Sequence, residues 1–176
     1  YEQQIQQARN GNYTPFLDYL QHYQQQHALT PEQVADWLQV ASWAGHDDEV
    51  IEVWQRYGIY MPLPARGVAA VAQARRNQKA WQPALSLWKE ACSLAPNNDD
   101  YRIGYIKTLA DARMDALALQ EARQLVTQNP TQAHLQDASR MSGYAREKAG
   151  IGFWRTRAHW LPRQRIMSCS ASLSTP

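Results

Sequence analysis

Histidine is the side chain in this sequence that could most readily hold a metal ion or move a proton. The five histidines are scattered, at positions 22, 27, 46, 134 and 159. His22 and His27 are five residues apart, whereas two histidines that bind zinc from one helical face are four apart. The spacing therefore predicts no metal site.

Three consecutive carboxylates at positions 47–49 could in principle bind cations. They follow Gly45, at a point where a helix is expected to begin. Acidic side chains at such a point cap backbone amides and complement the helix dipole. We interpret the group as a helix start, and Asp99 and Asp100 in the same way.

Motifs for nucleophilic, phosphate-transfer or dinucleotide chemistry do not occur. The sequence has no GxSxG, no P-loop and no GxGxxG. Cys92 and Cys169 are far apart and neither belongs to a CxxC pair. Cys92 is expected to be a small, half-buried residue. We therefore expect no catalytic residue, no cofactor and no enzymatic activity.

Composition indicates a folded chain of about one domain, because 44% of its residues are apolar and 19% are charged. Residues 1–135 carry a net charge of −3 and residues 136–176 a net charge of +5. The basic end lacks any zinc-finger, RNP or helix-turn-helix signature, so no nucleic-acid partner is expected. No apolar run approaches the ~20 residues of a membrane-spanning helix, so no membrane span is expected.

The elements that must position any functional side chain follow from a repeat of 34 residues. Prolines recur at this spacing at 62, 96 and 130, and tryptophans at 54 and 88. Three more columns share it: Phe16, Val50, Ala84 and Ala118; Gly11 and Gly45; and Tyr13, Asp47, Trp81 and Asp115. Thirty-four residues is the period of the tetratricopeptide repeat, a pair of antiparallel helices. The predicted fold is all-α, a TPR-like α-solenoid of about 3.5 repeats with an irregular C-terminal tail.

Each column has a physical role in such a stack. Small residues at Ala84 and Ala118 let crossing helices approach closely. Trp54 and Trp88 fill the space between one helix and the next repeat. Gly45 supplies the positive φ of a tight turn, and the prolines end the second helix of each pair.

The full units are expected at 31–64, 65–98 and 99–132, after a partial unit at 1–30. Thr30 and Gln33 form a capping box around Pro31, which fixes the start of a helix. The core of the three units is expected from the pairs Trp37-Leu38, Val71-Ala72 and Tyr105-Ile106. The columns fail after residue 132, so 133–176 is expected to be an aborted repeat and an irregular basic tail.

Several strings in these units resemble one family. They are ARNGN (8–12), ADWLQVASWAG (35–45), LPARGVAAVA (63–72), SLWKEACSLAPNNDDY (86–101) and TLADA (108–112). The strings are similar to the N-terminal periplasmic repeat region of the poly-β-1,6-N-acetylglucosamine export porin family, over about residues 1–135. They are much more specific than the general repeat consensus.

The resemblance implies a periplasmic scaffold, associated with the outer membrane in the full-length family. Its implied partners are a periplasmic polysaccharide deacetylase and partly deacetylated poly-N-acetylglucosamine. The sequence departs from the family because the repeats stop near Gln136 and no pore follows. We therefore expect a truncated form whose tail is out of frame, which translation of the coding DNA in its other frames would test.

In this repeat class the first helix of each pair lines the concave face, where partners bind. The expected binding residues are Glu32, Gln39, Trp43, Arg66, Gln73, Arg76, Asn77, Asp100, Lys107 and Asp111. Trp43 would stack on a sugar or else pack against a neighbouring helix. The acidic members would pair with amines of deacetylated glucosamine, whereas the basic members would bind an acidic partner.

Two other functions stay open. One is a general protein-binding tetratricopeptide scaffold with some other partner. The other is a carbohydrate-active enzyme, which the sequence disfavours because no paired carboxylates stand in a catalytic context.

Overall fold

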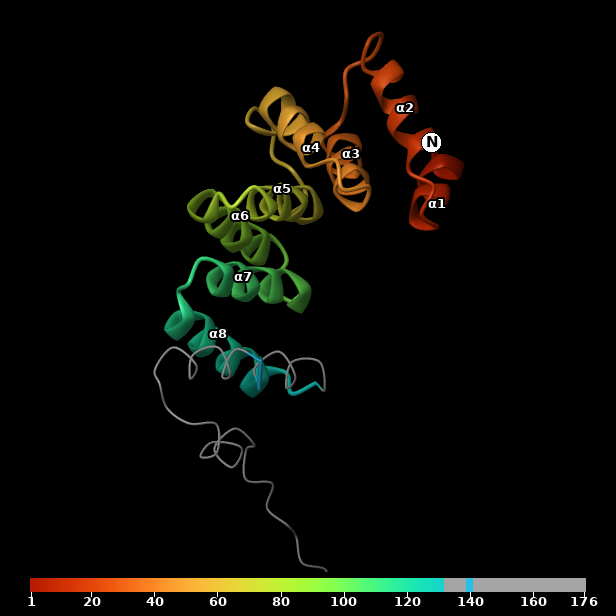
Figure 1. Ribbon diagram of the computed structural model, residues 1–176. Coiled ribbons are helices and arrows are strands. Elements are labelled where there is room, and N and C mark those ends of the chain that lie inside the picture. The colour runs from red at the N-terminus through yellow and green to blue at the C-terminus, as the bar shows by residue number, and fades with distance from the viewer. Residues whose placement is uncertain (132–138, 141–176) are drawn as a thin grey trace, which may run out of the picture.

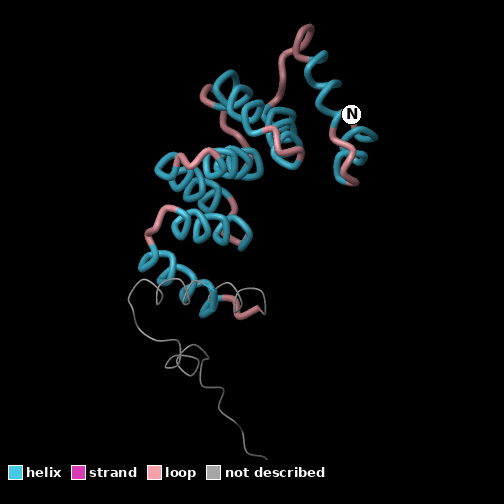
Figure 2. The backbone as a smooth tube through the Cα atoms, viewed as in Figure 1, coloured by secondary structure: helices cyan, strands magenta, loops and turns pink. Residues whose placement is uncertain are grey.

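The computed structural model describes residues 1–131, 139 and 140, and this part of the chain is built from helices without a β-strand (Figure 2). The helices are α1 (Glu2–Arg9), α2 (Thr14–Tyr23), α3 (Pro31–Trp43), α4 (Asp47–Val53), η1 (Trp54–Gly58), α5 (Ala65–Asn77), α6 (Trp81–Leu94), α7 (Asp99–Asp111) and α8 (Asp115–Gln128). The predicted all-α, TPR-like fold is confirmed. Of the expected tail, 133–176, only residues 139 and 140 are described.

The helices pack in pairs along the chain: α1 with α2, α3 with α4, α5 with α6, and α7 with α8 (Figure 1). We call α1, α3, α5 and α7 the first helices, and α2, α4 with η1, α6 and α8 the second helices. Successive first helices also pack on one another, α3 on α5 and α5 on α7. The described residues show no comparable contact between two second helices. Each second helix also packs on the first helix of the next pair, α2 on α3, α4 on α5 and α6 on α7, so the first helices take part in the contacts between successive repeats.

The 34-residue register is visible in the turn between the two helices of each pair. Gly11 and Gly45 have φ angles of +92° and +75°, and the next positions in the column, Lys79 and Arg113, have +59° and +63°. The positive φ predicted for Gly45 is confirmed. The same left-handed turn is kept in the later units, although Lys and Arg are strained in it.

The ends of the second helices follow the proline column in two units out of three. The helices α6 and α8 end two residues before Pro96 and Pro130. The residues that precede these prolines, Ala95 and Asn129, have nearly the same extended conformation, with φ −137° and −142°. In unit 31–64 the second helix instead ends in the π-helical turn η1, four residues before Pro62.

The predicted core is confirmed. The pairs at 37–38, 71–72 and 105–106 are all buried, and so are Ala84 and Ala118 at the helix crossings. Trp88 is buried and Trp54 half-buried. The capping box at Thr30 is also present, with both of its hydrogen bonds.

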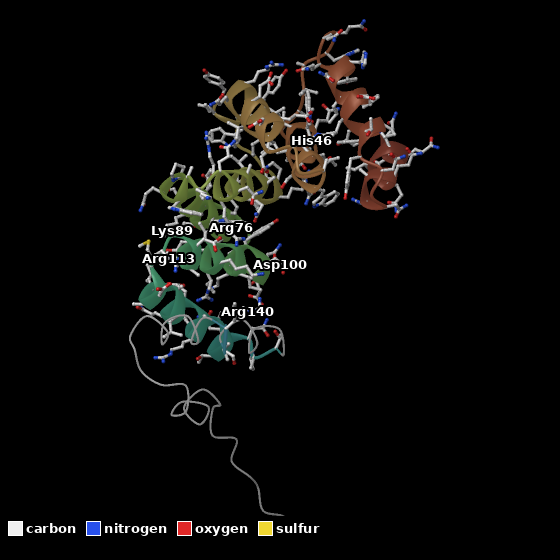
Figure 3. All side chains as sticks on the ribbon, in the orientation of Figure 1. His46, Arg76, Lys89, Asp100, Arg113 and Arg140 are labelled. Carbon is white, nitrogen blue, oxygen red and sulfur yellow. The ribbon has the colours of Figure 1, made fainter. Side chains whose placement is uncertain are left out.

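Both acidic groups lie at helix starts, as expected, but neither supplies the expected side-chain cap. Residues 47–49 lie in the first turn of α4, where they complement the dipole, but no side chain caps this helix. At α7 the cap is Asn98, whose side chain accepts a hydrogen bond from the backbone N–H of Asp100 at 3.1 Å. Figure 3 shows Asp100 and Arg113 at opposite ends of α7.

Candidate partner-binding face

The ten expected binding residues all lie on first helices, and we call them the inner face. Three are on α3, four on α5 and three on α7. Nine of them, all but Arg76, align in columns of equivalent positions: 32, 66 and 100; 39, 73 and 107; and 43, 77 and 111. Packed helix axes lie about 8–10 Å apart, so members of one column are neighbours across the stack.

Arg66 is held by two carboxylates of the preceding first helix. Its Nε donates to Asp36 Oδ1 at 2.9 Å, and its Nη2 donates to the Glu32 carboxylate. Burial alone would lower the pKa of the Arg66 guanidinium, but the hydrogen bond with Glu32 and the charge of Asp36 outweigh that effect and raise it. Arg66 and Glu32 thus form an ion pair between repeats.

Asp36 is a residue of this face that the sequence analysis missed. Its side chain is 13% exposed, and it accepts hydrogen bonds from both Arg66 and the Tyr1 hydroxyl. Burial, together with the bond to Asp36 and its charge, raises the pKa of Tyr1. One carboxylate therefore joins three elements, since Tyr1 immediately precedes α1. The sequence could have indicated Asp36, because it lies one helical turn after Glu32 and therefore on the same face of the helix.

A second set of contacts lies at the other end of the first helices. Arg76 Nε donates to Asp111 Oδ2 at 2.6 Å, from α5 to α7. Asn77 Nδ2 donates to both carboxylate oxygens of Asp47, at 3.1 and 3.0 Å. Gln73 Nε2 in turn donates to Asn77 Oδ1 at 2.8 Å. The structure thus brings six of the ten expected residues into contacts that join neighbouring helices or neighbouring turns.

The other four residues of the inner face are differently placed. The side chains of Gln39, Trp43, Asp100 and Lys107 form no hydrogen bond or ion pair with another described residue. Trp43 is 44% exposed, so part of its indole packs and the rest faces solvent. The exposed indole is thus open to a ligand that can stack on it.

The carboxylate of Glu49 on α4 is held by two neighbouring side chains. Glu49 Oε1 accepts a hydrogen bond at 2.8 Å from Nε1 of Trp37, a buried residue, and Glu49 Oε2 lies 3.1 Å from His46 Nδ1. Within the described ranges no group of three or more His, Cys, Asp or Glu side chains could hold a metal ion. Nor is any described helix long and apolar enough to cross a membrane.

Comparison with known proteins identifies relatives of this chain. Over 135 residues it is 47% identical to the "Poly-beta-1,6-N-acetyl-D-glucosamine export protein" of Escherichia coli (strain K12), a match that covers 77% of this chain and 16% of that protein. The protein of the same name from Escherichia coli O157:H7 matches equally. No family model and no solved structure matches the chain. Over 77% of its length, the chain is therefore homologous to a segment of the poly-β-1,6-N-acetyl-D-glucosamine export proteins.

Proposed function

We propose that this repeat region is a non-catalytic binding scaffold in the export of poly-β-1,6-N-acetyl-D-glucosamine, and that its inner face contacts the polymer. The exposed indole of Trp43 on that face carries the proposal. The relatives are named as export proteins of this polymer, and their similarity to the chain supports the choice of ligand. We also propose that the scaffold lies in the periplasm, as the family resemblance implies.

The chemistry of the inner face suits a sugar chain. The C–H face of a pyranose is apolar and stacks on an aromatic ring, whereas its rim carries hydroxyl and amide groups. Gln39 lies one turn before Trp43, and Gln73 and Asn77 occupy the equivalent positions on α5. Amide side chains both donate and accept hydrogen bonds, as sugar hydroxyls and acetamide groups require.

Calorimetric titration of the whole chain with partly deacetylated β-1,6-linked glucosamine oligomers tests the proposal. We expect binding to these oligomers and none to acidic peptides of similar length. Trp43→Ala should weaken binding about five- to tenfold, since an aromatic contact contributes about 1 kcal/mol. Tyr60→Ala is the matched control, because Tyr60 is an exposed aromatic residue away from the inner face.

The decisive outcome is the pair of affinities measured for the two variants. If Trp43→Ala binds like the original chain while its helical circular dichroism is unchanged, the inner face does not contact the sugar. Incubation with the same oligomers should release no shortened or deacetylated product. Turnover would overturn the non-catalytic assignment.

Docking of a periplasmic polysaccharide deacetylase is a second candidate function, favoured by two large apolar side chains that are exposed to solvent. Ile59 and Tyr60 follow the early end of η1 and are 56% and 82% exposed. Large exposed apolar side chains often mark protein contacts. Tyr60→Ala should then weaken deacetylase binding in a pull-down while Trp43→Ala leaves it intact. Equal capture of both variants would remove this candidate.

A further inference from the structure

The α1–α2 pair is attached to the stack differently from the later pairs. The helices α3, α5 and α7 pack on one another in succession, but α1 makes no comparable contact with α3. In Figure 1 the α1–α2 pair stands apart from α3 and α4. The apolar core nevertheless continues from α2 into α3, since Leu20 and Val34 belong to one buried cluster. The pair therefore packs on the next unit mainly through α2.

The connection that follows α2 is the longest between two described pairs. It spans residues 24–30, whereas the later connections span 59–64 and 95–98. Each later connection contains a proline of the 34-residue column, which restricts its backbone. Ala28 occupies that column position in the first connection, so this backbone restriction is missing there.

The point at which this connection can bend follows from its backbone hydrogen bonds. The N–H groups of residues 25–27 still donate to the carbonyls of His22 and Tyr23, in the last turn of α2. Thr30 already caps α3, and Leu29 is buried. The N–H of Ala28, between these two anchored ends, donates no hydrogen bond to a described residue and its side chain is exposed. The chain is therefore least restrained around Ala28.

Two polar links cross from the first pair to unit 31–64. The Tyr1 hydroxyl donates to the Asp36 carboxylate on α3. On the side of the second helices, Gln24 Oε1 accepts hydrogen bonds from the Tyr57 hydroxyl at 2.7 Å and from Arg56 Nη1 at 3.1 Å. Because such bonds exchange with bonds to water, their net contribution is small, and they can break without unfolding the repeats.

We propose that the α1–α2 pair pivots about Ala28 and that these two links hold it in a closed position. Tyr1 moves with the pair, because its ring contacts Phe16 and Tyr19 of α2, with 5.6 and 6.3 Å between ring centroids. In the closed position the Tyr1 hydroxyl occupies the Asp36 carboxylate, which is 13% exposed. Opening frees that carboxylate, so the pivot sets how much of α3 a partner can reach.

Distances between paired spin labels, measured by pulsed electron paramagnetic resonance on the whole chain, test the pivot. One label pair joins Gln21 on α2 to Ser86 on α6 and spans the connection. The other joins Ser86 to Gln120 on α8 and lies within the later units. All three positions are exposed, and the labels are attached at cysteines introduced there in a Cys92→Ser, Cys169→Ser background. The spanning pair should give the broader distance distribution.

Tyr1→Phe is the informative variant, because it removes the hydroxyl and keeps the ring. It should raise the ratio of open to closed molecules about fivefold, the factor that corresponds to a net hydrogen bond of about 1 kcal/mol. Tyr57→Phe should change the spanning distances in the same direction, and neither variant should change the distances from Ser86 to Gln120. Tyr60→Phe is the matched control, since its exposed hydroxyl forms no hydrogen bond with a described residue.

Two results would count against the proposal. A spanning distribution as narrow as that of the later units would overturn the pivot. A broad distribution that neither Tyr1→Phe nor Tyr57→Phe changes would overturn the role of the two links. Both measurements are made without sugar, so they leave the proposed polymer binding untouched.

Discussion

Arg76 on α5 and Asp111 on α7 join first helices of successive repeats, with 2.6 Å between Nε and Oδ2. The two positions are 35 residues apart, one more than the repeat period. Arg66 and Glu32 form the corresponding link between α5 and α3 at the other end of these helices. Both pairs cross between repeats, so residues of the inner face help to hold the stack together.

The link between Arg76 and Asp111 should be measurable by a double-mutant cycle. We expect Arg76→Ala, Asp111→Ala and the double variant to give a coupling free energy of about 0.5 kcal/mol, because the side chains are 23% and 42% exposed and solvent screens them. Urea unfolding at low salt and at 1 M salt provides the measurement, and the coupling should fall at high salt.

A cycle on Arg56 and Glu52 serves as the comparison, since this pair lies within one second helix and is more exposed. Its coupling should be no more than about 0.5 kcal/mol, as for other pairs one turn apart. Zero coupling for Arg76 and Asp111 at low salt would show that they do not join the repeats energetically.

The left-handed turns offer a second prediction. Lys79→Gly and Arg113→Gly should each raise the free energy of unfolding by about 0.5–1 kcal/mol, because glycine adopts a positive φ without the steric clash of a Cβ. Equilibrium urea unfolding measures the change. A lower free energy of unfolding in both variants would contradict the assignment of strain to this column.

The reverse substitution, Gly45→Ala, isolates the backbone effect. Nothing lies within 4 Å of a Cβ added at Gly45, so no steric contact with neighbours enters. The variant should lose about 1 kcal/mol. Gly11→Ala should behave similarly, since its φ is also strongly positive and its surroundings are also open.

The repeat register explains why most of the fold could be predicted from the sequence. Buried positions such as Ala84 and Ala118 recur because each repeat makes the same contact, so spacing alone located them. The proline spacing could not predict that the second helix of unit 31–64 ends early, at Gly58, because Pro62 lies in the same register as Pro96 and Pro130. The early end depends on local packing: a Cβ at Gly58 would lie 3.1 Å from Leu63 and from Trp54.

The ten expected binding residues lie on first helices, but the pairings among them were not foreseen. Glu32 and Arg66 are 34 residues apart, and Arg76 and Asp111 are 35 apart, so opposite charges at neighbouring repeat positions were visible in the sequence. Each residue was considered alone as a ligand contact. Asp47 shows the opposite error, because its place at a helix start suggested a cap while its side chain reaches across to α5.

Cys92 gives a prediction about pH. Burial raises the pKa of its thiol; the charge of Arg102 lowers it by less, and the charge of Glu121 adds to the rise. Because the thiolate is the reactive form, alkylation by iodoacetamide should reach its half-maximal rate above the ordinary thiol pKa of about 8.5. The rates are measured in a Cys169→Ser background. In guanidinium the midpoint should return to about 8.5, and an unchanged midpoint in the folded chain would contradict the shift.

Gly104 on α7 lies directly against the indole of Trp88 on α6. A Cβ added at Gly104 would lie 2.5–2.7 Å from three atoms of the Trp88 ring, closer than real side chains approach. Gly104→Ala should therefore lower the free energy of unfolding by about 1–3 kcal/mol, although alanine is the better helix former by about 1 kcal/mol.

The same substitution in a Trp88→Leu background separates the clash from the helix propensity. Leucine removes the ring that the new methyl group would meet, so the penalty at Gly104 should vanish and the propensity gain of up to about 1 kcal/mol should appear. Urea unfolding of the four chains in this cycle gives the two differences. If Gly104→Ala is equally destabilising with and without Trp88, the glycine is required for some reason other than the close approach of α6 and α7.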